Sequence, residues 1–350
     1  MTNVALIGLG MVAGTFVDAL ERLSDTITVR GVYARNPDRR RKFMTDFAEK
    51  LPADCVSYGS VDEIAKDGAV DFVILATPPN ARKEIVKTLA GAGKPILMEK
   101  PVERNWDAAK ELCDTCEDKG VSLGIVLQHR MRPAAQKLTG LIASGELGKL
   151  HAVEVRSAWW RPQSYYDEPG RGTYERDGGG VLISQAIHTL DLMLSLAGPV
   201  SEVTAMTSTT GLHKMETEDF VAAGLVFENG ALGSLFASTA SFPGRPESIN
   251  LHFEKASVEL VSNLLTLDWP DGRRETFGAV AATGAGANPM AFSSDWHMAI
   301  IEDFDVSLKN GQPPIVPGRA ALSVHGLIEA LESSGRLGQK MKLVNGRIVN

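Results

Sequence analysis

Several kinds of residue are scarce in this chain of 350 residues, and each scarcity excludes a class of protein. Three cysteines cannot form a disulfide framework in a chain of this length, so we expect a reducing, cytoplasmic location. Basic residues are outnumbered, 36 Lys and Arg against 43 Asp and Glu, which argues against nucleic acid as the main partner. Apolar runs such as residues 70–76 fall far short of the roughly 20 residues that a membrane helix needs, so we expect no membrane partner.

The remaining composition is that of a globular protein, with 44% hydrophobic and 23% charged residues. A chain of this length exceeds what one hydrophobic core usually holds, so we expect two domains. Residues 3–8 predict a buried strand at the start of the chain rather than an export signal.

The first part of the chain alternates between strand-like and helix-like segments. Apolar, β-branched runs occupy residues 4–8, 27–33, 70–76 and 95–98, and segments with helical spacing lie between them. Near-continuous apolar strands separated by helices indicate a parallel sheet covered on both faces. The fold class of this half is therefore α/β.

A glycine-rich turn follows the first predicted strand and precedes a predicted helix. Gly8, Gly10 and Ala13 fit the Gly-x-Gly-x-x-Gly/Ala pattern, in which the glycines allow a tight turn and close approach to a pyrophosphate. The following helix directs its amide groups and positive dipole end at the phosphates. We therefore assign these residues, together with Met11 and Val12, to cofactor binding. The alternative is a glycine-rich turn without a ligand.

The end of the second predicted strand discriminates between the two dinucleotides. NAD-selective folds usually place Asp or Glu there, whereas this chain has Ala34 and Arg35. Arg35 and Arg39 are suited to a 2′-phosphate through charge-assisted hydrogen bonds, so we predict NADP, with NAD as the alternative. The competing interpretation is that residues 39–42 are only the solvated face of a helix.

Three further segments give a resemblance to a known family. They are Thr77-Pro78-Pro79-Asn80, Glu99-Lys100-Pro101, and the run from a triple glycine at 178–180 through His188 to Asp191. Together with the glycine turn, they resemble the Gfo/Idh/MocA family, of the glucose-fructose oxidoreductase and inositol dehydrogenase type.

The resemblance implies two domains with different tasks. Residues 1–125 would form an NAD(P)-binding Rossmann domain, and residues 126–350 a substrate-binding and oligomerisation α/β domain with a large open, mostly antiparallel sheet. Members are commonly dimers or tetramers through that sheet, and most oxidise or reduce a sugar, cyclitol or related polyol.

The second half agrees with an antiparallel sheet. Strand-like runs succeed one another, several alternate in polarity, and Glu228-Asn229-Gly230 is a good hairpin turn between two of them. The predicted strands are residues 150–158, 200–207, 219–227, 231–239, 248–253 and 257–261. An amphipathic helix is predicted over residues 295–310, stopped by Gly311.

Lys100 and His188 are the predicted catalytic residues. By resemblance Lys100 is the family's active-site lysine, and burial near a cationic nicotinamide would lower its pKa and suit it to acid–base work. We predict that His188 hydrogen-bonds the reacting oxygen and lies beside Lys100. Ser184 stands where the inositol dehydrogenase type carries an aspartate, and a serine cannot stabilise an imidazolium as a carboxylate would. With a helix beginning near Ile183, Ser184, His188 and Asp191 would share one face.

The resemblance and the sequence position assign the remaining site residues. Cofactor binding is predicted for Thr77, Pro78, Asn80, Glu99, Lys100 and Gln128. Substrate binding is predicted for Lys100, Arg130, Trp160, Arg161, Ser184, His188 and Asp191. Trp160 and its aromatic neighbours are alternatively core or subunit-contact residues. Arg82 stands where many members carry a histidine, so that residue's cofactor contact does not transfer.

The function expected is hydride transfer between a nicotinamide cofactor and a hydroxyl or carbonyl group of a sugar-like polyol. One alternative enzyme retains its cofactor and uses transient oxidation for epimerisation or glycoside cleavage. Another alternative is a non-catalytic, NADP-sensing regulatory protein, which would need neither Lys100 nor His188. We expect no metal site, and no redox or zinc role for Cys113 and Cys116, because a second cysteine pair is missing.

Overall fold

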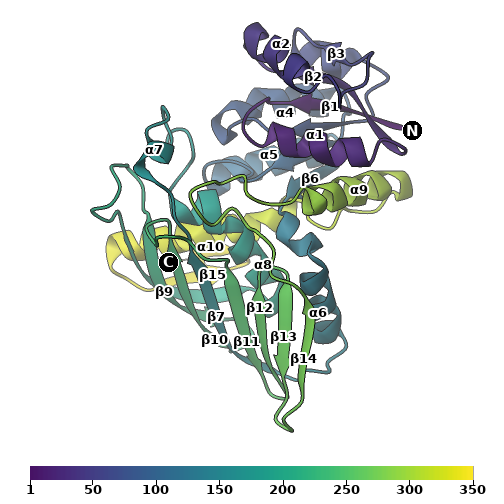
Figure 1. Cartoon of the computed structure of the whole chain (residues 1–350). Helices are drawn as coiled ribbons and strands as arrows, with labels where there is room; N and C mark the ends of the chain where they lie inside the picture. Colours follow the sequence, from purple (N-terminus) through teal and green to yellow (C-terminus); the bar gives the residue numbers. More distant parts are fainter. Residues whose placement is uncertain (350) are drawn as a thin grey trace. The chain divides into compact units, whose positions relative to one another are not determined.

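The computed structural model describes residues 1–349, which form two compact units (Figure 1). Unit 1 comprises Met1–Glu103, Asp107–Gln128 and Ser293–Ala321, and unit 2 comprises Arg104–Trp106, His129–Phe292 and the chain from Leu322 onward. The first unit therefore extends beyond residue 125, because a late segment returns to it. In that segment, helix α9 (Asp295–Asn310) packs against the first helix and the last strand of unit 1.

Unit 1 is built on a six-stranded, all-parallel sheet of order β3-β2-β1-β4-β5-β6. The strands are β1 (Thr2–Ile7), β2 (Ile27–Tyr33), β3 (Val56–Ser57), β4 (Phe72–Leu75), β5 (Ile96–Glu99) and β6 (Leu123–Val126). The helices of this unit that precede α9 are α1 (Ala13–Arg22), α2 (Pro37–Asp46), α3 (Val61–Lys66), η1 (Pro79–Ala81), α4 (Arg82–Gly91) and α5 (Trp106–Asp118). Every residue of β4, β5 and β6 is buried, as expected for parallel strands covered on both faces.

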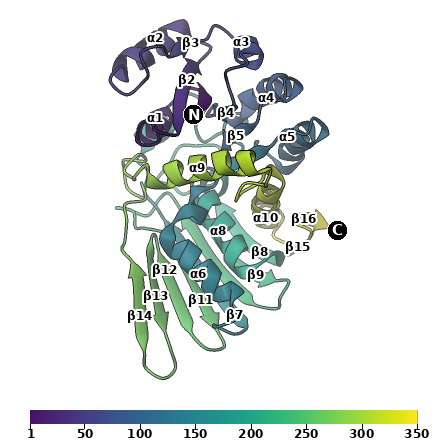
Figure 2. The ribbon, with the colours of Figure 1, turned by 90° about the vertical axis from the view of Figure 1, so that its right-hand side faces the viewer.

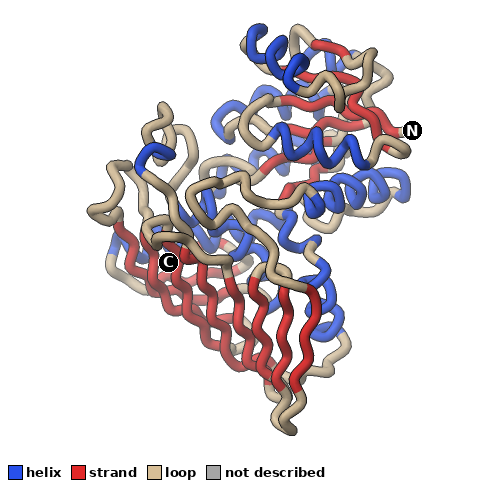
Figure 3. The backbone as a smooth tube through the Cα atoms, viewed as in Figure 1, coloured by secondary structure: helices blue, strands red, loops and turns tan. Residues whose placement is uncertain are grey.

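Unit 2 contains one wide sheet of ten strands, drawn in red in Figure 3, in the order β14-β13-β12-β11-β7-β10-β9-β8-β15-β16. The strands are β7 (Leu150–Ala158), β8 (Val200–Ser208), β9 (Phe220–Phe227), β10 (Leu232–Ser238), β11 (Ser248–Phe253), β12 (Ser257–Val261), β13 (Leu264–Asp268), β14 (Arg274–Gly278), β15 (Met341–Val344) and β16 (Arg347–Val349). All neighbours pair antiparallel except β7 and β10, so the expected mostly antiparallel sheet is confirmed.

Helices cover one face of this sheet (Figure 2). Helix α8 (Ile187–Ala197) packs on β7 and β11, and α6 (Pro133–Ala143) packs on β13 and β14. Helix α10 (Gly318–Leu337) reaches β8, where the Ser334 hydroxyl accepts a hydrogen bond from the Ala205 amide at 2.9 Å. The short elements η2 (Gln128–Met131) and α7 (Gln163–Tyr166) lie in the loops.

The hairpin predicted at residues 228–230 is present between β9 and β10. Gly230 adopts a φ of 87°, and the Gly230 amide donates to the Phe227 carbonyl at 2.9 Å. Such a left-handed conformation suits glycine because it has no Cβ. The predicted helix over residues 295–310 is also confirmed, and Gly311 ends it in the left-handed region.

The helix predicted to begin near Ile183 is not a regular α-helix. Residues Leu182–Ala186 form a π-helix, η3, and the α-helical turns of α8 begin only at Ile187. A π-helix has a wider turn than an α-helix, but a spacing of four residues is still close to one full turn. The common face of Ser184 and His188 therefore stays a prediction.

Within residues 1–349, every helix is too short or too polar to span a lipid bilayer.

Candidate active site

The carboxyl ends of three strands in unit 1 lie side by side. Ile7 of β1 is opposite Leu75 of β4, and Leu75 is opposite Met98 of β5. The chain therefore leaves these strands at one edge of the sheet, carrying Gly8, Thr77 and Lys100 in the loops that follow. In this strand order the direction of winding reverses between β1 and β4, which is where open α/β sheets bind ligands.

The turn after β1 fits a dinucleotide pyrophosphate. A Cβ on Gly8, whose φ is +97°, would lie 2.6 Å from the Ala76 backbone, so only glycine is accommodated there. Apart from Gly10 and its two chain neighbours, no heavy atom of residues 1–349 lies within 4 Å of a Cβ built on Gly10, so space is open there. Helix α1 follows with Val12 as its N-cap and no side-chain capping hydrogen bond. An uncapped helix start beside open space suits an anionic group.

The tip of β2 carries arginines in two different situations. Arg40 is held in place, because its Nη1 donates to the Ala34 carbonyl at 2.7 Å and its guanidinium lies 5.8 Å from the Tyr33 ring centre. Arg35 and Arg39 are exposed, and neither forms an ion pair with any residue of 1–349. No carboxylate occupies the tip of this strand.

Polar atoms near the same edge are buried without protein partners. The Thr77 Oγ1 and Gln128 Oε1 atoms have no hydrogen-bond partner among the described residues. Buried polar atoms usually find a partner, and a bound polar ligand would supply one. Pro78 and Asn80 are exposed in the same loop as Thr77. Together with the open turn, these atoms fit a nicotinamide dinucleotide.

Arg82 at the start of α4 ties the loops after β4 and β5 together. It is 1% exposed, and its Nε and Nη2 donate to the Thr77 carbonyl at 3.1 and 2.7 Å. Its Nη1 donates to the carbonyls of Glu99 at 2.5 Å and Val102 at 3.3 Å, and also to that of Pro101. Burial lowers the pKa of Arg82 to about 10. The sequence analysis did not predict this role. It noted Arg82 only because the residue differs from the family pattern.

Lys100 directly follows β5 and is half-buried, and Glu99 before it is buried. The Glu99 carboxylate lies 3.8 Å from Nε2 of His297 on α9. The His297 ring in turn contacts the edge of Phe16 on α1, with centroids 5.4 Å apart. No motif pointed to His297, because α9 lies nearly 200 residues further along the chain than Glu99.

In unit 2, Arg130 and Asp191 form a bidentate ion pair. Arg130 Nε donates to Asp191 Oδ2 at 2.8 Å and its Nη2 to Oδ1 at 2.6 Å. Burial raises the pKa of Asp191 above its ordinary value, although the Arg130 charge opposes that shift. His188, one turn before Asp191 on α8, is 7% exposed, and Ser184 in η3 is half-buried. Lys100 belongs to unit 1 and His188 to unit 2, and their joint action stays a prediction.

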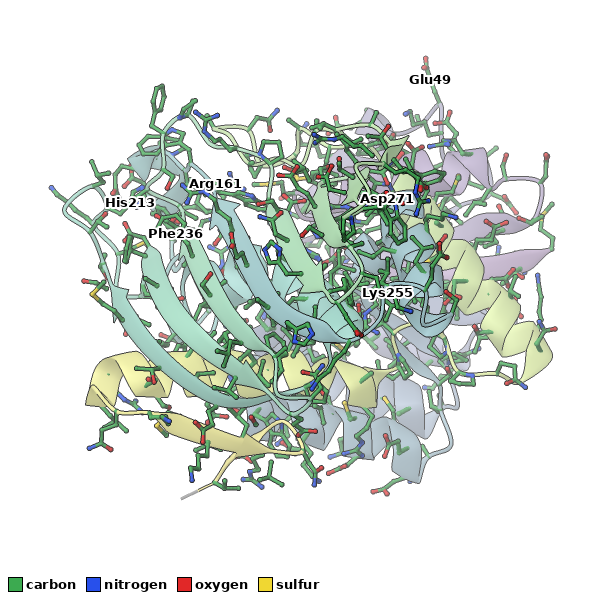
Figure 4. The ribbon with its side chains drawn as sticks, turned by 90° about the horizontal axis from the view of Figure 1, so that it is seen from below. Glu49, Arg161, His213, Phe236, Lys255 and Asp271 are labelled. Atoms are coloured by element: carbon green, nitrogen blue, oxygen red, sulfur yellow. The ribbon has the colours of Figure 1, made fainter. Side chains whose placement is uncertain are left out.

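The two predicted substrate residues after β7 differ in surroundings. Trp160 is half-buried, and its ring meets Phe242 at 5.5 Å in an edge-on arrangement. Arg161 is 2% exposed and donates to the carbonyls of Trp160 at 2.8 Å and Gly286 at 2.6 Å. Figure 4 shows Arg161 near His213, whose Nε2 lies 2.8 Å from the Arg161 carbonyl. The Arg161 guanidinium is thus used to hold loop backbone together.

The cysteine pair Cys113 and Cys116 is buried on α5. Burial raises the pKa of both thiols to about 12, so neither ionises near neutral pH.

Family comparisons agree with the geometry of both units. The family model described as "Oxidoreductase family, NAD-binding Rossmann fold" matches residues 2–126. The model described as "GFO/IDH/MocA C-terminal domain" matches residues 135–259. The chain belongs to the Gfo/Idh/MocA family. It is an oxidoreductase, and the family resemblance and fold class predicted from the sequence are confirmed.

Relatives within the Gfo/Idh/MocA family differ in how much of the chain they cover. A D-apiose dehydrogenase from Rhizobium rhizogenes is 24% identical, covering 97% of this chain and 96% of the relative. A myo-inositol 2-dehydrogenase from Thermotoga maritima is 25% identical, covering 90% and 91%. An uncharacterised oxidoreductase from Schizosaccharomyces pombe is 30% identical, but the match spans only 52% of this chain and 50% of the relative.

A solved structure of the same fold covers almost the whole chain. The WlbA dehydrogenase from Bordetella pertussis, crystallised with NADH and UDP-GlcNAcA, matches with a TM-score of 0.83 and 26% identity over 98% of both chains.

Proposed function

We propose that this Gfo/Idh/MocA enzyme is an NADP-dependent dehydrogenase or reductase acting on a CH–OH group of a sugar, cyclitol or related polyol. The observation that carries the proposal is Lys100 at the carboxyl end of β5, beside strands whose loops fit a dinucleotide. When bound, the nicotinamide would give or accept the hydride.

The preference for NADP rests on the tip of β2. Ala34 and Arg35 stand where an NAD-selective site carries a carboxylate, and the exposed side chains of Arg35 and Arg39 are suited to a 2′-phosphate. Arg40 is bound to the Ala34 carbonyl and shapes the turn instead. NAD remains the competing cofactor, since the matching WlbA structure holds NADH.

The substrate class rests on the relatives and on the chain's own side chains. Full-length relatives are named for D-apiose and myo-inositol, and WlbA was crystallised with a nucleotide-linked sugar acid. We assign Trp160 an apolar face for sugar C–H groups and Arg130, fixed by Asp191, a hydrogen-bonding role toward substrate oxygens.

Two residues carry the proton chemistry in this proposal. Lys100 gives a proton to the carbonyl oxygen during reduction and removes it from the hydroxyl during oxidation. His188 hydrogen-bonds the reacting oxygen without changing its charge, because Ser184 offers no carboxylate to balance an imidazolium.

We also propose a cytoplasmic homodimer or homotetramer assembled through the sheet of unit 2. The sheet face without helices carries exposed apolar side chains, with Met206 60% and Leu232 61% exposed. An apolar face of this kind is usually covered by a partner. The three cysteines are free, as a reducing compartment would leave them.

The test is a screen of sugars, cyclitols, sugar acids and their keto forms as substrates. The absorbance of NADPH or NADH reports turnover. We expect turnover with at least one polyol and a lower dissociation constant for NADPH than for NADH. In Arg35→Ala the constant for NADPH should rise about tenfold, while that for NADH changes little, because only NADPH carries the 2′-phosphate. Arg41→Ala, on helix α2 that follows Arg35, is the matched control. Tighter binding of NADH by the wild type would contradict the NADP assignment.

A further inference from the structure

A second histidine lies against the predicted catalytic one. The rings of His129 in η2 and His188 on α8 stack with centroids 4.9 Å apart and planes inclined by 29°. His129 is 4% exposed, so both rings are almost wholly buried in unit 2. None of the sequence motifs pointed to this contact.

His129 is itself held by a buried ion pair. Nη2 of Arg132 lies 2.6 Å from His129 Nε2, and Nη1 of Arg132 lies 2.7 Å from a Glu247 carboxylate oxygen. Arg132 is 1% and Glu247 2% exposed. Arg132 Nη1 also donates to the Ser262 carbonyl at 3.2 Å. The pair therefore joins η2 to the loops that flank β11 and β12.

The chemistry of these atoms fixes the state of His129. A guanidinium has five N–H donors and no acceptor, so Arg132 can only donate to His129 Nε2. That nitrogen must then carry its lone pair, which leaves the proton of the ring on Nδ1. This contact favours a neutral His129 with its proton on Nδ1, because the hydrogen bond at one ring nitrogen sets where the proton lies.

The two arginines around the stacked rings are each balanced by a carboxylate. Arg132 pairs with Glu247, and Arg130 pairs with Asp191 at 2.6 Å. The charge of each arginine is therefore opposed by a buried carboxylate.

We infer that His129 is a positioning residue for the proposed catalytic His188, and that the Arg132–Glu247 pair locks it in the neutral Nδ1–H form. Stacking on His129 fixes the plane of the His188 ring. The expected effect on kcat rests on the proposed function. The expected tautomer of His129 does not depend on it.

The kinetic experiment compares two substitutions of His129 in the full chain. His129→Phe keeps a flat ring for stacking, whereas His129→Leu removes it. We expect kcat to fall about 100-fold in His129→Leu and much less in His129→Phe, because a misplaced catalytic group is costly. The KM for NADPH should not change in either variant. His151→Leu, at an exposed position on β7, is the matched control. Equal loss in both His129 variants, or full activity in His129→Leu, would overturn the positioning role.

A spectroscopic experiment keeps the inference testable if no substrate turns over. In protein labelled with nitrogen-15 histidine, the long-range proton–nitrogen spectrum distinguishes the tautomers, and His129→Phe assigns the signals. Near neutral pH we expect His129 to be neutral with its proton on Nδ1, and to lose this single tautomer in Glu247→Gln. A cationic His129, or one protonated on Nε2, would overturn the inference whatever the enzyme's activity. If no substrate turns over but the spectrum is as expected, the result counts against the proposed function and not against this inference.

Discussion

At the scale of single residues, Arg82 shows most clearly how one side chain can hold two loops together. It is buried among the backbone carbonyls of the loops after β4 and β5. A guanidinium can donate in several directions at once, which no imidazole can do. Arg82 therefore fixes the backbone of the loops that carry Thr77 and Lys100.

Arg82→Lys tests this clamp while keeping the positive charge. Lysine offers one compact ammonium in place of a planar fork, so it cannot reach the carbonyls of both loops. We expect the free energy of unfolding to fall by about 3 kcal/mol, as for the loss of two charge-assisted hydrogen bonds. Urea denaturation measures it, with exposed Arg274→Lys as control. A loss no larger than that of the control would refute the clamp.

The role of a residue could be predicted from the sequence where the residue belongs to a motif. It could not be predicted where the role depends on a contact between distant segments. The glycine turn and Lys100 could be placed at strand ends because strand periodicity and the fingerprint fix their positions along the chain. Contacts such as Arg82 with Pro101 or His129 with His188 depend on side-chain packing between separate segments. Neither spacing nor residue type encodes such contacts in one sequence.

At the scale of elements, the segment leading into α8 departs most from simple periodicity. The Glu218 side chain binds the start of this segment. Its carboxylate oxygens accept hydrogen bonds from the amides of Gly180 and Leu182, each at 3.0 Å. The Glu218 carbonyl also accepts from the Val181 amide at 2.8 Å. Three successive contacts with one residue bring the backbones very close, which explains the triple glycine ahead of the π-helix.

Gly180→Ala should disrupt this approach. A Cβ on Gly180 would lie 1.8 Å from the Glu218 carbonyl oxygen, so one backbone must move. We expect a loss of at least about 2 kcal/mol in the free energy of unfolding, the usual cost of forced overpacking. Gly140→Ala is the matched control, because open space surrounds that helical glycine and alanine favours the helix there. Equal stability of the two variants would contradict the close approach.

Element boundaries were predictable for the strands that alternate clearly in polarity. The predicted ranges of β7, β11 and β12 are confirmed, because each is a regular run ended by a turn. Strand β14 has no buried residue and was missed, since an exposed edge strand carries no hydrophobic pattern. The π-helix was not predicted, because the residue types of Leu182–Ala186 do not distinguish a π-helix from an α-helix.

At the scale of the whole molecule, unit 2 contains a cavity of about 370 Å³ lined by acidic side chains. Glu218, Glu329 and Glu332 contribute to its wall, opposed by Arg104 and Arg336. Burial raises the pKa of Glu218 to about 7. Burial and the Glu218 charge raise the pKa of Glu332 well above its ordinary value. These carboxyls make the stability of the molecule depend on pH.

Glu332→Gln should weaken that dependence. A raised pKa means that the folded state holds a proton which the unfolded state releases, so the contribution of Glu332 to stability falls as the pH rises. Glutamine removes this titration. Between about pH 5 and about pH 8, the free energy of unfolding of the variant should therefore rise relative to the wild type. Urea denaturation across this range measures the difference.

Glu49→Gln is the control for that experiment, because Glu49 projects away from the molecule in Figure 4 and is exposed. Its stability should follow the wild type at every pH. A difference between Glu332→Gln and the wild type that does not vary with pH would show that Glu332 is ionised alike in the folded and unfolded states.

The measurement that tests the account most directly is turnover by Lys100→Ala with a polyol that the wild type accepts. We predict that kcat falls at least about 100-fold, as expected for loss of a general acid–base. The dissociation constant for NADPH should change far less than kcat, because Gly8, Gly10 and the other predicted cofactor contacts remain. Lys87→Ala, exposed on α4, should retain full activity. Undiminished turnover in Lys100→Ala would contradict the central claim.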